Sequence, residues 1–309
     1  MSEGPAASVA GRLGTDLGPA VEASPREGPT ATADTWARSR ARQARSSWGT
    51  ATWVKVGLPV VTAVVFVLIW AVVARIWFAH RSYLLPSPLA TWKAAVHGRT
   101  SLLEGTRTTL VESAAALAIA LALGGVIGVV MAQWRTLARA LYPYAVVLQT
   151  VPIIATAPVI VLWFHYGHTS VIVIATIVAL FPILSNTYLG LISADRGHVD
   201  LLKMHHAGRV FEFRALRLPT ALPQVFAGLR ISAGLTVVGT IVGEFLIGQG
   251  GPHAGLGVQI VVSQAQLNTA LLFAQALMAS LVGLAFFVGA TLLSHVCLRN
   301  WHESARAEE

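Results

Sequence analysis

The chain has 309 residues, of which 55% are hydrophobic and only 12% are charged, and its mean hydropathy is +0.65. A soluble globular domain carries about 25% charged residues, so this composition excludes an ordinary soluble domain and favours a protein of the lipid bilayer. The formal net charge of +8 does not indicate nucleic-acid binding, because the basic residues cluster between apolar runs, where they suit lipid headgroups.

The two ends of the chain differ from the rest. Residues 1–50 are rich in Ala, Gly, Pro, Ser and charged residues and have no apolar periodicity. Such a segment cannot bury enough apolar surface to offset its chain entropy, so we expect a disordered N-terminal tail. No apolar core follows a short basic start, which argues against a secretory signal peptide. A transmembrane domain is predicted over residues 51–300, followed by a short tail over 301–309.

Six apolar segments are long enough to cross a bilayer as helices. The sequence "HYGHTS" divides one long uncharged stretch into the third and fourth of them. The fifth contains Arg230 and Glu244, which must face protein or water if this segment spans the membrane. The six predicted spans are Val56–Phe78, Ser113–Trp134, Tyr144–Phe164, Ser170–Leu191, Val225–Ile247 and Asn268–Cys297. The prediction is an all-α, polytopic membrane protein with about six transmembrane helices.

The distribution of Lys and Arg predicts the orientation of these helices. If the N-terminus is cytoplasmic, the inner segments hold sixteen Lys and Arg residues and the outer segments hold four. Positively charged residues accumulate on the cytoplasmic side of membrane proteins. We therefore expect both termini, and the segment between the fourth and fifth spans, to lie in the cytoplasm.

The segment "HVDLLKMHHAGRVFEFRALRLPTALP" interrupts two strongly apolar stretches with charged residues. Its pattern predicts two short helices, His198–His206 and Arg209–Leu216. Phe211, Ala215 and Leu218 recur at i, i+4 and i+7 and would form one apolar stripe. The step Leu218-Pro219 is expected to end the second helix, because proline disfavours helical geometry in the residue before it. A solvated interfacial helix is the alternative to a docking helix.

This segment resembles the cytoplasmic "EAA" loop of bacterial ABC-importer permeases, in which E-A-A is followed by three residues, Gly, nine residues and I-x-L-P. Here Leu216-Arg217-Leu218-Pro219 fits the ending and Asp200 occupies the acidic position. Leu201 and Leu202 replace the two alanines, and His206 replaces the glycine. The loop would cover residues 195–222.

The missing glycine of the motif leaves two alternatives for the bend between the helices. Gly208, two positions later, is one candidate. The other is His206 itself, because histidine adopts the left-handed conformation more often than most residues do.

The resemblance extends over about residues 55–300. It includes "LQTVPIIATAPVIVLWFHYG", "LPTALPQVFAGLRISAG" and "VVGTIVGEFLIGQGG", which are similar to permeases that import nitrate, taurine, alkanesulfonates and pyrimidine-type vitamin precursors. The stretches "IVGEF" and "SQAQLNTALLF" favour the branch for hydroxymethylpyrimidine or riboflavin-like nutrients. The resemblance implies a type I ABC-importer permease fold in the bacterial inner membrane.

The same resemblance implies partners. Two permease copies, usually a homodimer, would form the pathway, each docking its loop on a cytoplasmic ATPase while an extracytoplasmic binding protein delivers the solute. The docking residues would be Asp200, Leu201, Leu202, His206, Gly208, Arg209, Glu212, Leu218 and Pro219.

The energy source is expected to lie in another chain. The sequence has no G-x-x-x-x-G-K-[ST] and no "GK" pair, so it has no Walker A loop for ATP. ATP and Mg²⁺ would be bound by the partner ATPase, and this chain would carry no cofactor and no enzymatic activity. A stand-alone secondary transporter or channel, with the loop as an ordinary positive-inside connector, is the alternative function.

Four polar positions in the spans are candidates for the translocation pathway: Gln149, Thr150, Asn186 and Glu244. Hydrogen bonding between helices is the alternative for each, and for Glu244 a partner from Thr, Gln or backbone groups would suffice. Pro152, Pro158 and Pro182 are expected to kink the third and fourth spans. The glycines of "ALGGVIGVV" are expected to permit close helix packing, and no histidine cluster has recognised metal-ligand spacing.

Overall fold

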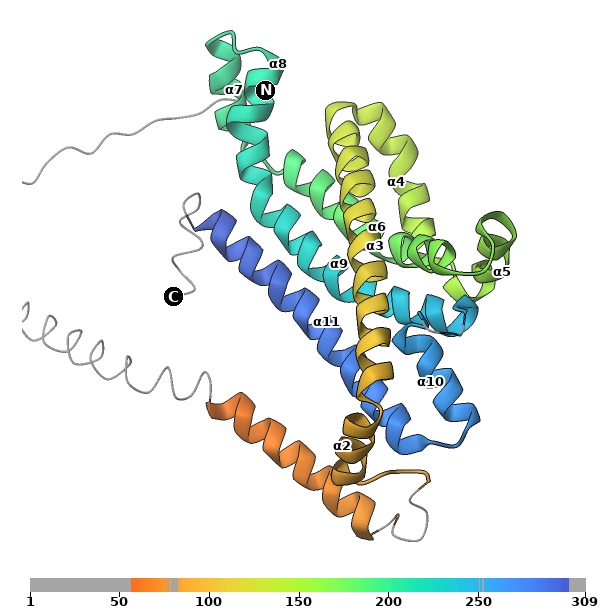
Figure 1. The fold of residues 1–309 in the computed structure, drawn as a ribbon. Coiled ribbons are helices and arrows are strands. Elements are labelled where there is room, and N and C mark those ends of the chain that lie inside the picture. Colours follow the sequence, from red (N-terminus) through yellow and green to blue (C-terminus); the bar gives the residue numbers. More distant parts are fainter. Residues whose placement is uncertain (1–56, 77, 79–82, 250, 252, 300–309) are drawn as a thin grey trace, which may run out of the picture. The chain divides into compact units, whose positions relative to one another are not determined.

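The computed structural model describes residues 57–76, 78, 83–249, 251 and 253–299. The predictions for residues 1–50 and 301–309 lie outside these ranges. The described residues form helices and no strand. The helices are Gly57–Ile76, α2 (Pro88–His97), α3 (Arg99–Gln133), α4 (Arg135–Thr150), α5 (Ile153–Phe164), α6 (His168–Ile192), α7 (Arg196–Met204), α8 (Arg209–Glu212), the π-helical turn η1 (Phe213–Arg217), α9 (Leu218–Ile247), α10 (Leu256–Ala265) and α11 (Thr269–Leu298) (Figure 1).

Apart from the third, the apolar spans predicted from the sequence are confirmed as helices within the described residues. In the part of the chain that the structure describes, five helices are long and apolar enough to cross a membrane, and α4 with α5 forms a sixth candidate if this bent pair counts as one span. Several helices are longer than their apolar runs: α3 begins at Arg99 rather than Ser113. The apolar run marks the part of a helix that suits lipid, whereas the helix continues wherever its backbone hydrogen bonds do.

The third predicted span, Tyr144–Phe164, is wrong as a single helix. Helices α4 and α5 meet at an angle of 102°. The break lies at Val151 and Pro152, which both have extended backbone, with ψ of 122° and 113°. Proline disfavours the helical region for the residue before it and donates no N–H, so the chain turns there. The predicted kink at Pro152 is thus a sharp corner.

Helix α6 packs along both α3 and α9 and forms the centre of the helix assembly (Figure 1). Small residues permit this close packing, as expected for helices in a membrane. A Cβ at Gly128 of α3 would lie 2.8 Å from Cβ of Thr187, and a Cβ at Gly228 of α9 would lie 2.7 Å from Cβ of Asn186. The expected packing role of "ALGGVIGVV" holds for Gly124 and Gly128, whereas Gly125 has no neighbour within 4 Å.

The helix that leads into α9 does not end at Leu218-Pro219, so that prediction is wrong. Helical backbone runs without interruption over Arg209–Ile247, through α8, η1 and α9. In η1 the N–H of Leu218 donates to the carbonyl of Phe213, five residues earlier. A wider turn of this kind accommodates Pro219, whose ring would clash with the preceding turn of a regular α-helix.

Two short helices that the apolar runs did not predict lie beside the ends of longer ones. Helix α2 begins at an N-cap, Ser87, whose hydroxyl accepts from the N–H of Ala90 at 3.2 Å. Helix α10 packs against α3, α9 and α11. Its first turn is held by the side chains of Thr109 of α3 and Glu244 of α9.

Candidate functional site

The first candidate site is the polar loop made by α7, α8 and η1, which lies at the junction of α6 and α9 (Figure 1). Helix α7 begins at Asp195, whose carboxylate accepts from the N–H of Gly197 at 2.6 Å and of His198 at 3.3 Å. A side-chain cap of this kind satisfies N–H groups that the first helical turn leaves without partners. The first helix of the loop is thus Arg196–Met204, close to the predicted His198–His206.

Helix α7 ends at the position where the "EAA" pattern has glycine. His206 has a φ of 53°, in the left-handed region, and its N–H donates to the carbonyl of Lys203 at 2.9 Å. The N–H of Ala207 donates to the carbonyl of Leu202 at 3.0 Å. These two bonds form a Schellman motif, which favours glycine at the left-handed position. Of the two alternatives for the bend, His206 is the residue that turns the chain; Gly208 has a φ of −69° and caps α8.

The second half of the loop is fixed by an ion pair across η1. Nη2 of Arg217 lies 2.6 Å from Oε1 of Glu212, and Nε of Arg217 donates to the same oxygen at 2.7 Å. Asp200 instead pairs with Lys203, at 3.2 Å, on an exposed face of α7. The structure thus gives Glu212 a partner five residues later, through the π-helical turn.

The loop also leaves large apolar side chains uncovered. Leu201 and Met204 of α7 and Val210 and Phe211 of α8 are all exposed. The expected stripe of Phe211, Ala215 and Leu218 assumed regular helical spacing, and the wider turn of η1 changes that register. The apolar surface of the loop is therefore contributed by α7 and α8 together.

The predicted pathway residues do not come together in one place. Gln149 and Thr150 are exposed at the end of α4, where the Thr150 hydroxyl donates to the carbonyl of Val147 at 2.8 Å. Asn186 donates from its side-chain nitrogen to the carbonyl of Pro182 at 2.7 Å and accepts from Gln224 of α9 at 3.0 Å.

Glu244 lies well apart from Asn186. Asn186 packs against Gly228, and sixteen residues of α9, or about 24 Å of helix, separate Gly228 from Glu244. The four predicted positions thus belong to at least two separate sites.

Glu244 is buried, with 2% of its surface exposed, and forms the centre of a polar cluster. Its Oε1 accepts from the hydroxyl of Thr109 at 2.7 Å and its Oε2 accepts from the N–H of Gly257 at 2.6 Å. The Thr109 oxygen also accepts from the N–H of Leu256 at 3.0 Å. Helix α10 has no side-chain cap of its own, so Glu244 and Thr109 together cap it from α9 and α3.

Three residues of this cluster, Thr109, Glu112 and His168, were not predicted as site residues from the sequence. Glu112 of α3 is buried, with 3% of its surface exposed, and its Oε1 lies 2.6 Å from Nδ1 of His168 of α6. Together with Thr109, these side chains link the helices around Glu244. The available signal was an acid at the border of an apolar run, since Glu112 directly precedes the predicted span Ser113–Trp134.

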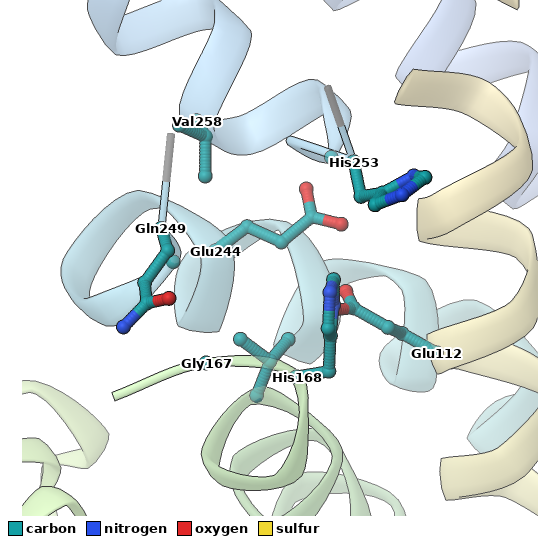
Figure 2. Close-up of a pocket in the computed structure, with 10 residues that line it drawn as sticks. Glu112, Gly167, His168, Glu244, Gln249, His253 and Val258 are labelled. Carbon is teal, nitrogen blue, oxygen red and sulfur yellow. The ribbon is translucent and has the colours of Figure 1, made fainter. Parts of the chain in front are cut away.

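A small cavity of about 30 Å³ lies in this cluster (Figure 2). Glu112, His168, Glu244, Gln249 and His253 provide its polar lining. Figure 2 shows both carboxyl groups and both imidazole rings turned toward the same space. Within the described ranges, no group of three His, Cys, Asp or Glu side chains could hold a metal ion.

Comparison with known proteins identifies the family. Residues 120–297 match the family described as "Binding-protein-dependent transport system inner membrane component". The formylaminopyrimidine transport permease protein of Halalkalibacterium halodurans is 34% identical over 244 residues, which cover 78% of this chain and 94% of the relative. The riboflavin transport system permease protein of Chloroflexus aurantiacus is 31% identical over 256 residues, which cover 82% and 92%.

A third relative, a probable ABC transporter permease protein of Haemophilus influenzae, is 30% identical over 238 residues, which cover 77% of this chain and 95% of the relative. These three matches each cover more than three quarters of this chain, and the relatives share the predicted type of function. The chain therefore belongs to the family of binding-protein-dependent transport system inner membrane components and is a transport permease.

Proposed function

We propose that this permease is the membrane subunit of an ABC importer for a small heteroaromatic nutrient and that α7 and α8 dock on a separate cytoplasmic ATPase. Two copies of the chain would form the pathway, and a binding protein outside the membrane would deliver the solute. ATP and Mg²⁺ would be bound by the ATPase, because this chain has no Walker A sequence.

The observation that carries the docking proposal is the apolar surface of the loop. Leu201, Met204, Val210 and Phe211 are exposed by 49%, 73%, 67% and 58%. Four large apolar side chains on two short helices form the kind of face that an amphipathic helix places in a partner's groove. The Schellman motif at His206 and the ion pair of Glu212 with Arg217 hold these two helices in a defined geometry.

The continuity of the helix after the loop supports a mechanical role. The 39 residues of Arg209–Ile247 would form a single rod of about 58 Å. A displacement of α8 by a moving ATPase would therefore reach the membrane part of α9 along continuous helical backbone, provided that η1 keeps its hydrogen bonds. This is how ATP-driven motion in one protein would change the conformation of another.

The names of the relatives support a proposal for the substrate class. The two permeases named for formylaminopyrimidine and riboflavin are 34% and 31% identical to this chain. A relative named for aliphatic sulfonates, from Bacillus subtilis, is 27% identical over 228 residues. We therefore favour a small, planar, nitrogen-containing ring compound over a sulfonate or nitrate.

Copurification tests the docking proposal. The substitutions Leu201→Asp and Phe211→Asp place charges on the apolar face and should abolish recovery of the ATPase with the tagged permease. Trp92→Asp is the matched control, because Trp92 is exposed by 68% on α2, away from the loop. Recovery of the ATPase with both loop variants at the wild-type level, or transport driven by an ion gradient without any ATPase, would contradict the proposal.

Labelling tests the orientation. In a Cys297→Ser background, His206→Cys should react with a membrane-impermeant maleimide in inverted vesicles and stay unlabelled in intact cells with a permeabilised outer membrane. The reverse pattern would place the loop outside the cytoplasm and overturn the docking proposal.

Ligand binding tests the substrate class. The binding protein encoded with this permease should bind a formylaminopyrimidine or riboflavin-like compound in calorimetric titrations. Selective binding of an aliphatic sulfonate or nitrate would contradict the substrate class and leave the docking proposal intact.

A further inference from the structure

Two buried acidic side chains from different helices face one another inside the helix assembly. Glu112 of α3 and Glu244 of α9 are exposed by only 3% and 2%, and both line the same cavity (Figure 2). Burying one ionised carboxylate is costly, and burying two side by side adds repulsion between like charges. The contacts of the four carboxyl oxygens show how this pair is accommodated.

Three of the four oxygens have ordinary hydrogen-bond partners. Oε1 of Glu244 accepts from Thr109 and its Oε2 accepts from the N–H of Gly257. Oε1 of Glu112 lies 2.6 Å from Nδ1 of His168. The fourth oxygen, Oε2 of Glu112, is buried, and no N–H or hydroxyl group of the described residues donates to it.

The remaining neighbour of Glu112 is the other acid. The carboxyl groups of Glu112 and Glu244 line the same cavity (Figure 2), where a hydrogen bond between them would satisfy Oε2 of Glu112. Two ionised carboxylates cannot form such a bond, because both only accept. One proton between them would supply the missing donor, satisfy the buried oxygen and remove one of the two negative charges.

No basic residue with a fixed charge replaces this proton. The titratable groups that line the cavity, other than the two acids, are His168 at the start of α6 and His253 between α9 and α10. Helix α10 carries no titratable side chain. Lys and Arg are absent from the described residues that line the cavity.

The site has a route for proton exchange. The side chain of His168 is 59% exposed while its Nδ1 contacts the buried Glu112. Imidazole can take up a proton at one nitrogen and release one at the other, which suits it to connect a buried acid with solvent. The cavity of about 30 Å³ beside the acids has room for one water molecule.

We propose that Glu112 and Glu244 form a binding site for one exchangeable proton, which holds α3, α9 and α10 together. With the proton bound, the pair needs no counter-ion, and Glu244 keeps its place as the cap of α10. Without it, two negative charges face each other in the cavity, and the contact between α3 and α9 weakens. His168 is the positioning residue through which the proton exchanges.

Infrared spectroscopy of the purified full-length protein in lipid nanodiscs tests the proposal directly. At about pH 7 an ordinary Glu is ionised, whereas this pair should show the C=O stretch of one protonated carboxylic acid that shifts in D₂O. Glu112→Gln and Glu244→Gln should each abolish this band, because the amide N–H₂ replaces the proton as the donor. Glu104→Gln is the control, since Glu104 is an exposed acid on the same helix, and it should leave the band unchanged.

Thermal unfolding as a function of pH gives a second readout. The native pair keeps a proton that an unfolded Glu loses above about pH 4.3, so the Tm of the wild-type protein should fall as the pH rises from that value until the pair itself loses its proton. Both Gln variants should lose most of this pH dependence. A wild-type spectrum without a band sensitive to either substitution would overturn the proposal. So would a Tm that depends on Na⁺ concentration through these two residues, because a metal cation would then occupy the place assigned to the proton.

Discussion

The hydroxyl of Thr109 donates to Oε1 of Glu244 at 2.7 Å, although the two residues belong to α3 and α9. The same hydroxyl oxygen accepts from the N–H of Leu256, the first residue of α10, at 3.0 Å. One side chain therefore connects three helices. This connection explains how an acid can lie inside an apolar helix, because its oxygens are satisfied by fixed donors.

Replacing Thr109 by valine should destabilise the protein. Thr109→Val keeps the shape of the side chain but leaves the buried N–H of Leu256 without an acceptor, at a cost of about 1–3 kcal/mol. The expected result is a lower Tm for the purified protein in detergent. Thr109→Ser retains the hydroxyl and is the control, and equal Tm values for the Val and Ser variants would contradict the role of the hydroxyl.

Adding one methyl group at Gly228 should separate α6 from α9. Its Cβ would lie 2.7 Å from Cβ of Asn186 and 2.9 Å from the carbonyl oxygen of Pro182, and a backbone atom cannot move aside cheaply. Overpacking of this kind costs about 1–3 kcal/mol, so Gly228→Ala should lower the Tm.

The matched control for Gly228 lies on the same helix. Gly234 has no atom within 4 Å of a built Cβ, and alanine is favoured over glycine in a helix by up to about 1 kcal/mol. Gly234→Ala should therefore keep or raise the Tm. A Tm for Gly228→Ala at or above that of Gly234→Ala would contradict the close packing of α6 and α9.

The left-handed backbone conformation of His206 restricts which residues this position accepts without strain. His206→Val introduces a β-branched residue at a φ of 53°, where left-handed backbone costs about 1–2 kcal/mol for an ordinary residue. His206→Gly relieves that cost. We expect faster hydrogen exchange at the amide of Ala207 in the Val variant and wild-type or slower exchange in the Gly variant.

The neighbouring histidine provides the control for this measurement. His205 has a φ of −84°, which valine adopts, so His205→Val should change the exchange of Ala207 much less than His206→Val does. Equal effects of the two substitutions would show that the left-handed turn does not limit the stability of the end of α7.

The ion pair of Glu212 with Arg217 should contribute more than the one of Asp200 with Lys203. The first pair is partly buried and holds two nitrogens of Arg217 on one oxygen, whereas both partners of the second pair are exposed. Double-mutant cycles on the free energy of unfolding should give a coupling of about 1 kcal/mol for the first pair and about 0.2 kcal/mol for the second. A reversed order would contradict a structural role of the ion pair across η1.

The apolar runs were sufficient to predict the long helices other than the bent pair α4 and α5, and the charged loop was sufficient to predict α7 and the start of α8. Both follow from local physics, since about 20 apolar residues suffice to cross a bilayer and Asp195 caps the helix that follows it. The corner between α4 and α5 could be predicted only as a kink at Pro152, because its angle depends on how α5 packs against α6 and α9.

The turn η1 and the acid pair could not be predicted for two different reasons. A π-helical turn has no characteristic composition, so the sequence does not reveal it. Leu218-Pro219 therefore predicts a helix end, although the wider turn accommodates the proline within a continuous helix. Whether Glu112 lies beside Glu244 depends on the axial offset between α3 and α9. Contacts between the two helices set this offset, such as the hydrogen bond from Ser113 to Thr240 at 3.0 Å. The sequence of either helix alone does not show which offset they adopt.

The uninterrupted helix over Arg209–Ile247 connects the polar loop with the acid pair along one helical axis. Arg209, beside the exposed Phe211, begins it, and Glu244 lies one turn from its far end. Helical backbone is stiff along its length, so an axial shift imposed near Arg209 must either carry Glu244 with it or be absorbed where the hydrogen bonds of η1 can be rearranged. The five residues of η1 thus lie where motion of the polar loop would be either conveyed to the acid pair or absorbed.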